Sequence, residues 1–207
     1  MMFKRKRRKI QKMGKLFVLM GKSASGKDAA YKRLLQDAEL GLKPYVGYTT
    51  RPVRENEQDG REYFFVTPDE LERLERSGKV IEKRTYHSVH GDWHYFSVDD
   101  GKVDLDSSNY LYIGTPEAYV PLRDHYGASR VIPIYMQVED GERLSRALAR
   151  ERKETTPRYA EMCRRFLGDT KDFSDEKLEQ AGIEKRFDNI DFEECISQIK
   201  EYIRSLS

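Results

Sequence analysis

The sequence contains few cysteines and no long apolar run, and both absences limit what the protein can be. Its two cysteines, Cys163 and Cys195, form no Cys-x-x-Cys pair, and a chain of this length needs no disulfide. No stretch approaches the roughly 20 consecutive apolar residues that cross a bilayer. The apolar stretch behind the basic N-terminus, Leu16 to Met20, is too short for the core of a secretion signal. We therefore expect a cytoplasmic protein that neither spans a membrane nor is secreted.

The chain also carries almost no net charge, but the total hides a strong asymmetry. The formal charge of +2 combines +8 from residues 1–15, which contain no acid, with −6 from the remainder. We expect residues 1–14 to form a basic flexible arm. Such a block can be a nucleic-acid patch, a nuclear address or a solvated leader that repels itself. The acidic remainder argues against a nucleic-acid-binding protein, apart from nonspecific binding by the arm.

From Leu16 onward, apolar runs alternate with signals for helix starts. Three short runs are typical of strands buried on both faces: Leu16 to Met20, Tyr110 to Ile113 and Val131 to Met136. Cap residues followed by proline or by a capping-box glutamate predict helices at Thr67-Pro68, Thr115-Pro116, Thr156-Pro157 and Asp191 to Glu194. This alternation predicts an α/β domain with a parallel sheet flanked by helices.

Two regions interrupt the alternation. Residues 45–97 are rich in aromatic and β-branched residues, and strands are expected over Glu62 to Val66, Val80 to Tyr86 and Trp93 to Val98. We interpret this region as an inserted, mostly antiparallel subdomain. Residues 139–181 are helical in pattern and rich in arginine. With a length between one and two ordinary domains, the chain is best described as one domain that carries an insertion.

A phosphate-binding motif follows the first predicted strand directly. Residues 21–28 read Gly-Lys-Ser-Ala-Ser-Gly-Lys-Asp, which matches Gly-x4-Gly-Lys but has Asp28 where Ser or Thr normally stands. Between a buried strand and a helix, such glycines let backbone N–H groups surround an anion at the positive end of the helix. The alternative is an ordinary strand-to-helix turn. We expect Lys27 to reach the terminal phosphates of a nucleoside triphosphate, and Asp28 either to ligate magnesium or only to favour the helix start.

A second dense cluster lies in the inserted region, where residues 49–66 carry Arg51 and Arg54 three positions apart. Guanidinium groups grip phosphate bidentately, and Glu57 could hold one of them in place. By themselves such residues also suit a solvated charged loop. Nearby, His87, His90 and His94 could suggest zinc, but their spacing does not force them to one point. A loop over a nucleobase, with His87, Trp93 and Tyr95 stacking or hydrogen-bonding, fits the segment better.

Taken together, the phosphate motif and the pattern Thr-Thr-Arg-x-x-Arg-x-x-Glu-x-x-Gly-x-x-Tyr-x-Phe-Val resemble the guanylate kinase family over roughly residues 15–204. The resemblance implies a P-loop NTPase core formed by residues 15–44, 98–138 and 182–207. It implies a nucleotide-monophosphate-binding insert at residues 45–97 and a small helical lid at residues 139–181. ATP and Mg²⁺ are the implied cofactors, and the implied partners are small nucleotides, with a monomer or homodimer as the assembly.

The resemblance also assigns roles to individual residues. Lys27, Arg51, Arg150 and Arg165 would be catalytic, and the ATP would contact Gly21, Ser23, Ala24, Ser25, Gly26, Lys27, Asp28 and Asn189. The acceptor would be bound by Arg51, Arg54, Glu57, Tyr63, Glu82, Tyr95 and Ser97, with Glu82 reading the guanine edge through its N1–H and N2–H₂ donors. Asp28 is the candidate magnesium ligand.

Some positions depart from the family pattern. Gly47 stands where a serine usually contacts the guanine carbonyl, and Tyr110 to Pro116 replaces an acidic strand end. Asp99 or Asp100 could approach in its place. The sequence therefore predicts a kinase that transfers the γ-phosphoryl of ATP to GMP or dGMP. The alternatives are a kinase of another nucleotide or small phosphorylated acceptor, and a non-catalytic module that binds a phosphorylated peptide.

Overall fold

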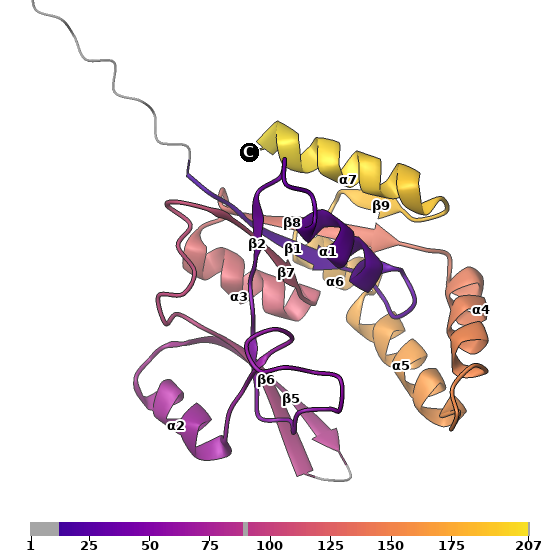
Figure 1. Cartoon of the computed structure of the whole chain (residues 1–207), viewed down its shortest axis with the longest axis horizontal. Helices are drawn as coiled ribbons and strands as arrows, with labels where there is room; N and C mark the ends of the chain where they lie inside the picture. The colour runs from indigo at the N-terminus through magenta and orange to yellow at the C-terminus, as the bar shows by residue number, and fades with distance from the viewer. Residues whose placement is uncertain (1–12, 89–90, 207) are drawn as a thin grey trace, which may run out of the picture.

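A parallel five-stranded sheet forms the centre of the computed structural model, which describes residues 13–88 and 91–206 (Figure 1). The strands lie in the order β2 (Leu42–Pro44), β7 (Asn109–Ile113), β1 (Leu16–Met20), β8 (Val131–Gln137) and β9 (Arg186–Asp188). All four pairings are parallel, and Leu16 is in register with both Tyr110 and Val131. The expected α/β fold with a parallel sheet is confirmed. Most of the predicted basic arm lies outside the described residues.

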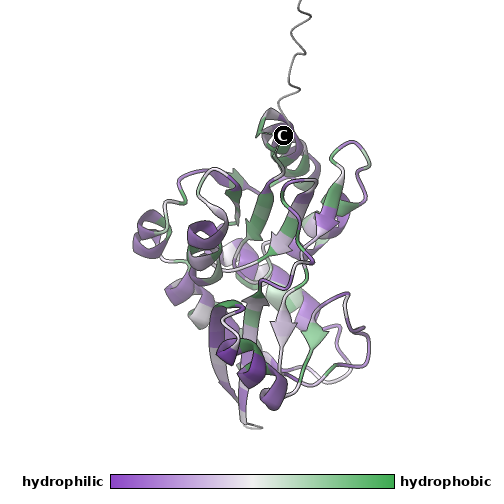
Figure 2. Ribbon diagram, turned by 90° about the vertical axis from the view of Figure 1, so that its left-hand side faces the viewer, coloured by the Kyte–Doolittle hydropathy of each residue, from purple (hydrophilic) through white to green (hydrophobic). Residues whose placement is uncertain are grey.

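Helices cover both faces of this sheet, because alternate side chains of the central strand point to opposite sides. Leu16, Val18 and Met20 pack against α3 (Pro116–Tyr126) and α6 (Asp175–Gln180). Phe17 and Leu19 pack against α1 (Lys27–Leu35) and α7 (Phe192–Leu206). Figure 2 shows the central strands in hydrophobic green, with much of the outer helix surface in purple. Every residue of β1 is fully buried, which explains its uninterrupted apolar sequence.

A second sheet forms beside the core, in the order β4 (Phe64–Phe65), β3 (Tyr48–Thr49), β6 (Gly91–Val98) and β5 (Val80–Ser88). Its β3–β6 and β5–β6 pairings are antiparallel, whereas β3 and β4 pair in parallel. The helix α2 (Pro68–Arg76) packs Leu71 against Tyr48, Phe96 and Val98 of this sheet. The strand expected over Glu62 to Val66 is only two residues long, because the preceding segment is occupied by turns.

Three of the four predicted helix starts are confirmed by their caps. The side-chain oxygens of Thr67, Thr115 and Asp191 accept hydrogen bonds from backbone N–H groups three residues later, at 3.2, 3.3 and 2.9 Å. The start predicted at Thr156-Pro157 is wrong, since α5 (Tyr159–Asp172) begins two residues further on. There the backbone N–H of Arg158 donates to the Glu151 carboxylate of the preceding helix.

The helices α4 (Asp140–Glu151) and α5 form an antiparallel pair on one side of the molecule. We call them the lid helices. In Figure 1 they stand on the right, across from the unit that contains α2, β5 and β6. None of the helices among the described residues is long and apolar enough to span a membrane.

Candidate active site

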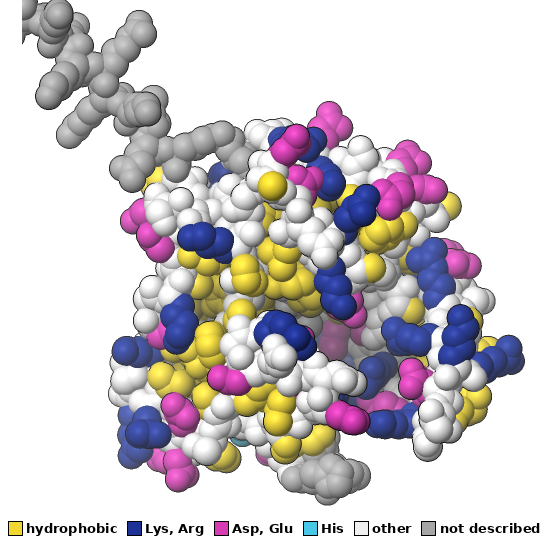
Figure 3. Space-filling model, in the orientation of Figure 1, with side chains coloured by type: hydrophobic (Ala, Val, Ile, Leu, Met, Phe, Trp, Pro, Cys, Tyr) yellow, Lys and Arg dark blue, Asp and Glu magenta, His cyan; other side chains and the backbone are white. Residues whose placement is uncertain are grey.

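A cavity of about 810 Å³, which we call the main cavity, lies between these units. Figure 3 shows a hollow between the lower part of the molecule and the lid side, with Lys and Arg side chains around it. Four parts of the chain line the main cavity: residues 21–27 after β1, the second sheet with its loops, residues 112–115 at the end of β7, and α5 with the residues that flank it. Segments that are far apart in the sequence therefore share one space.

The phosphate loop, residues 21–28, has the backbone that its glycines predict. Gly26 has φ of 87°, and Ala24 also adopts a left-handed φ of 63°. A Cβ at Gly21 would lie 2.5 Å from Ser25 Oγ, and one at Gly26 would lie 2.6 Å from Asn189 Nδ2. Both glycines are thus required by close approach, and Gly26 also by its conformation.

Lys27 is the first residue of α1, and it lines the main cavity together with Gly21 and Ser23. The first N–H groups of a helix have no intrahelical partner, so this end of α1 attracts anions. Asn189 lies behind the loop, where its side-chain amide donates to the Ser25 carbonyl at 2.8 Å. That contact fixes the loop, and the adenine-contacting role that the resemblance implies for Asn189 stays a prediction.

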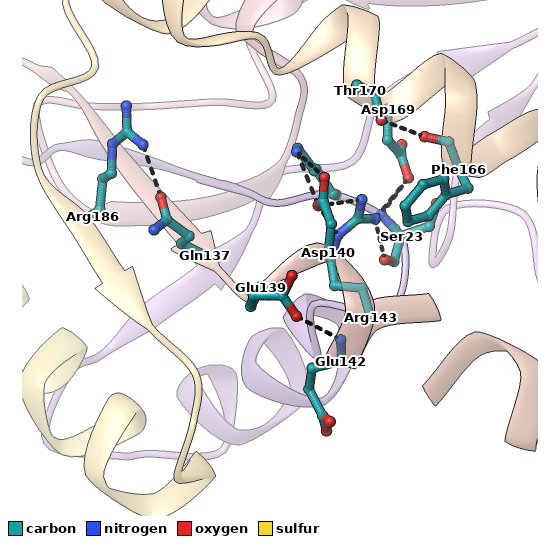
Figure 4. A network of polar contacts seen from close by, with 11 residues as sticks. Ser23, Gln137, Glu139, Asp140, Glu142, Arg143, Phe166, Asp169, Thr170 and Arg186 are labelled. Atoms are coloured by element: carbon teal, nitrogen blue, oxygen red, sulfur yellow. Dashed lines mark hydrogen bonds and ion pairs between the residues drawn. The ribbon is translucent and has the colours of Figure 1, made fainter. Parts of the chain in front are cut away.

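A buried arginine of α4 ties the phosphate loop to both lid helices (Figure 4). Arg143 is 1% exposed and donates to the Ser23 carbonyl at 3.0 Å and to Asp140 Oδ1 at 2.8 Å. It also lies 3.5 Å from the Asp169 carboxylate, and its guanidinium stacks on the Phe166 ring. Asp169 in turn accepts the Ser23 backbone N–H at 2.7 Å. Sequence reasoning missed Arg143 and Asp169, because their contacts exist only in the folded chain.

On the acceptor side, Arg54, Tyr63 and Tyr95 line the main cavity, as the resemblance implies for acceptor-binding residues. Arg51 and Glu57 lie behind them as a bidentate pair, at 2.8 and 2.9 Å. Burial acts to raise the pKa of Glu57, but the hydrogen bonds from Arg51 and Arg54 hold it below its usual value. Arg51 also donates to the Tyr95 hydroxyl at 2.9 Å. The pair therefore positions the loop and the Tyr95 ring.

Glu82 was expected to read the guanine edge. Like Arg51 and Glu57, it is not among the residues that line the main cavity. Its side chain is 3% exposed and accepts hydrogen bonds from Ser97 Oγ at 2.8 Å and from Arg84 Nε at 3.0 Å. Arg84, which sequence reasoning did not single out, lines the cavity in its place. The sequence could have indicated Arg84, because Arg84 follows Glu82 by two residues on the same strand and residues two apart on a strand share a face.

Arginines of the lid region face the same space. Arg165 lines both the main cavity and a smaller adjoining one of about 340 Å³, which Arg54 and Arg150 also line. Arg158 and Arg164 line the main cavity too, although the sequence did not identify them. Glu161 holds Arg164 and Arg165 at 2.7 and 2.9 Å, and these hydrogen bonds lower the pKa of Glu161 to about 2. The lid thus presents paired, oriented guanidinium groups.

The segment that departs from the family pattern lines the cavity with Tyr112, Ile113, Gly114 and Thr115. The cavity is also lined by His87, Trp93 and Tyr95. Their expected contact with a nucleobase stays a prediction. His90 lies outside the described residues.

The acidic residues that were expected near this segment lie elsewhere. Asp99 is paired with His125 at 3.3 Å, and Asp100 with Tyr48 and Lys102. Neither carboxylate is among the residues that line the main cavity.

The magnesium ligand that the sequence predicts at the phosphate loop is Asp28. Asp28 lies in the first turn of α1, directly after Lys27, and is exposed. Within residues 13–88 and 91–206, no group of three or more His, Cys, Asp or Glu side chains could hold a metal. Magnesium in nucleotide sites usually takes one or two carboxylates and completes its coordination with phosphate oxygens and water. Asp28 is not among the residues that line the main cavity, but its carboxylate is exposed beside Lys27 and could supply one hard oxygen donor to an ion that arrives with a nucleotide.

A parallel sheet of this order, with a phosphate loop after its central strand and an adjoining second sheet and helical pair, defines the P-loop NTPase fold. A solved structure supports this class: guanylate kinase from Anaplasma phagocytophilum superposes with a TM-score of 0.62 at 22% identity, covering 94% of this chain and 87% of that one.

Sequence comparison shows which proteins of this fold class the chain is similar to. The family model "Guanylate kinase" matches residues 13–96. The guanylate kinase of Porphyromonas gingivalis is 26% identical over 196 residues, which cover 92% of this chain and 97% of that protein. The guanylate kinase of Rhodopirellula baltica is 30% identical over 138 residues, 65% of this chain and 64% of that protein. By sequence, the chain is thus similar to guanylate kinases over most of its length, and the family model matches its first half.

Proposed function

We propose that this chain is an ATP-dependent nucleoside-monophosphate kinase that transfers the γ-phosphoryl of ATP to GMP or dGMP, giving ADP and GDP or dGDP. One observation carries the proposal: Lys27, Arg54 and Arg165 come from three separate parts of the chain and line the same cavity. A phosphoryl donor bound at the phosphate loop and a phosphate bound at Arg54 would face each other there. The names of the relatives agree with this activity.

Phosphoryl transfer of this kind needs positioning and charge neutralisation and little covalent chemistry from the protein. Arg54 and Tyr63 would orient the acceptor phosphate so that one of its oxygens attacks the γ-phosphorus in line with the leaving ADP oxygen. Lys27 and the lid arginines would neutralise the charge that spreads over the equatorial oxygens. No general base is required, because the attacking phosphate oxygen is already an anion. Closure of the lid helices on the insert would exclude water, which otherwise hydrolyses ATP.

Asp28 is the residue that would hold magnesium in this scheme. Magnesium held there would neutralise part of the negative charge of the nucleotide phosphates. Asp28 would bring one oxygen ligand to it from the first turn of α1, and Lys27 beside it would offset the added negative charge.

The activity is tested with a coupled assay that measures ADP release from ATP with GMP, dGMP, AMP, CMP or UMP as acceptor. We expect turnover with GMP and dGMP that depends on added magnesium. Calorimetry with ATP in the absence of acceptor separates a kinase from a binding module. Failure to bind ATP, together with no turnover on any monophosphate, would reject the proposed function and favour a phosphopeptide-binding role.

The variant Arg54→Ala is expected to raise KM for GMP by about 10-fold or more, with a smaller change in kcat, because a charge-assisted contact to the acceptor phosphate is lost. Arg61→Ala is a matched control in the same loop, since Arg61 is exposed and pairs with Glu62 at 2.7 Å. Steady-state kinetics with GMP varied at saturating ATP measures both variants. Equal KM values for wild type and Arg54→Ala would show that Arg54 does not bind the acceptor.

A further inference from the structure

The carboxylate that the family resemblance assigns to the nucleobase is closed off from the main cavity. Both oxygens of Glu82 are occupied: Oε1 accepts Ser97 Oγ at 2.8 Å and Arg84 Nη2 at 3.4 Å, and Oε2 accepts Arg84 Nε at 3.0 Å. With its side chain 3% exposed, Glu82 presents no open acceptor to a ligand. Separating it from Arg84 would leave a buried charge without its partner, which is strongly unfavourable.

Arg84 presents the opposite hydrogen-bonding character to the cavity. A guanidinium has five N–H donors and no acceptor. Four of the five N–H donors of Arg84 have partners within the described part of the chain. Two donate to Glu82, one to Thr115 Oγ1 and one to the Tyr112 hydroxyl. The bonds to Thr115 and Tyr112 are 3.3 and 3.4 Å, long for N–H···O contacts. A ligand with better-placed acceptors can replace them.

Arg84 keeps its charge in this setting. Burial acts to lower its pKa, but the neighbouring Tyr112 and Glu82 raise that pKa above its usual value. The side chain is 10% exposed, and it lines the main cavity together with Tyr86, Tyr95 and Tyr112. This end of the cavity therefore combines aromatic walls, suited to a planar ring, with a fixed cationic donor at the edge of that ring.

We infer that Arg84, and not Glu82, reads the base of the acceptor, and that it does so through adjacent hydrogen-bond acceptors such as O6 and N7 of a 6-oxopurine. The inference rests on the proposed function, because it concerns the acceptor of that same reaction. Arginine pairs bidentately with O6 and N7 of guanine, whereas adenine presents a donor at the corresponding position. Arg84 is thus a specificity-determining residue that selects 6-oxopurine monophosphates.

The two modes of recognition use different atoms of the base. A carboxylate that read N1–H and N2–H₂ would require the 2-amino group, and a site built around such a group rejects an analogue without it by about 100-fold or more. Recognition of O6 and N7 is indifferent to the 2-amino group. Inosine 5′-monophosphate, which is GMP without that group, should then be an acceptor comparable to GMP. The 7-deaza analogue of GMP, which lacks the N7 acceptor, should be poor.

The test measures kcat/KM of the wild-type protein for GMP, IMP and 7-deaza-GMP at saturating ATP and magnesium. We expect IMP to lie within about 10-fold of GMP, and 7-deaza-GMP to lose about 10-fold or more. A larger loss for IMP, or full activity with 7-deaza-GMP, would overturn the inference. If GMP itself is not phosphorylated, the proposed function fails, and that outcome is distinct from a preference for GMP over IMP.

The variant Arg84→Gln adds a second test. It should lower kcat/KM for both GMP and IMP by about 10-fold or more. Arg76→Gln is the matched control, because Arg76 is exposed on α2 and pairs with Glu72 at 3.7 Å, so its kinetics should equal those of the wild type. Melting temperatures of both variants identify any loss through unfolding, in which case the wild-type analogue series decides. Unchanged kinetics of folded Arg84→Gln would overturn the inference.

Discussion

Replacing Lys27 by methionine is expected to lower kcat by about 10³-fold or more, because oriented charge at the transferred phosphoryl group is the main source of catalysis in such reactions. Methionine keeps the length and most of the apolar volume of the lysine stem. Lys27 lies at the cavity surface in the first turn of α1. The fold should therefore survive, and the loss should appear in the coupled assay at saturating ATP and GMP.

Lys32→Met is the matched control for this prediction, since Lys32 is an exposed residue of the same helix. It should retain wild-type turnover, and circular dichroism should give similar melting temperatures for both variants. Turnover by a folded Lys27→Met protein equal to that of the wild type would contradict the proposed mechanism.

The variant Arg143→Met is expected to lower the free energy of unfolding by about 2 kcal/mol, because it removes charge-assisted hydrogen bonds of a buried guanidinium. Its loss leaves Asp169 without its cationic partner and removes the hydrogen bond to the Ser23 carbonyl. Asp140 is affected as well. Although partial burial opposes the effect, the hydrogen bonds from Arg143 and Lys22 lower the pKa of Asp140. Urea denaturation followed by circular dichroism measures the change.

Arg146→Met, one turn further along α4, provides the comparison. Arg146 pairs with Glu142 at 2.8 Å on the surface, and such pairs contribute about 1 kcal/mol or less. If both variants lost the same small amount, Arg143 would not be the link that stabilises the phosphate loop against the lid helices.

The parts of the fold that sequence predicts well are those governed by local interactions. β1 was recognisable because a strand buried on both faces needs an unbroken apolar run. The starts of α2 and α3 were recognisable because a threonine cap with proline satisfies the first N–H groups within a few residues. The phosphate loop was recognisable as well, because Gly21 must leave room for Ser25 four residues later and Gly26 adopts a left-handed φ.

The parts that sequence does not reveal depend on tertiary context. β2 and β9 are three residues long and partly exposed, so they have no periodicity to detect, and neighbouring strands induce them. The helix start predicted at Thr156 does not form. Instead, the turn between the lid helices brings the Glu151 carboxylate to the backbone N–H of Arg158, where the helix begins.

At the site, Arg54 and Arg165 line the cavity as the resemblance implied, but the sequence does not show which of the other arginines do so. Arg51 is held in a pair with Glu57 behind the cavity wall, whereas Arg84 was overlooked and faces inward. Burial and pairing, which decide this difference, are set by the packing of β5 and β6 and not by spacing along the chain.

The hydrogen bond from Asn189 to the Ser25 carbonyl joins residues 164 positions apart in the chain. During synthesis, the phosphate loop is therefore made long before the amide that completes it. β1 likewise waits for β7 and β8 before either of its edges is paired. Contacts so distant in sequence close slowly, since chain entropy must be lost before they form. A nascent chain of this protein thus acquires its complete phosphate loop only after Asn189 has been synthesised, so a complete site requires that the chain from β1 to Asn189 has folded.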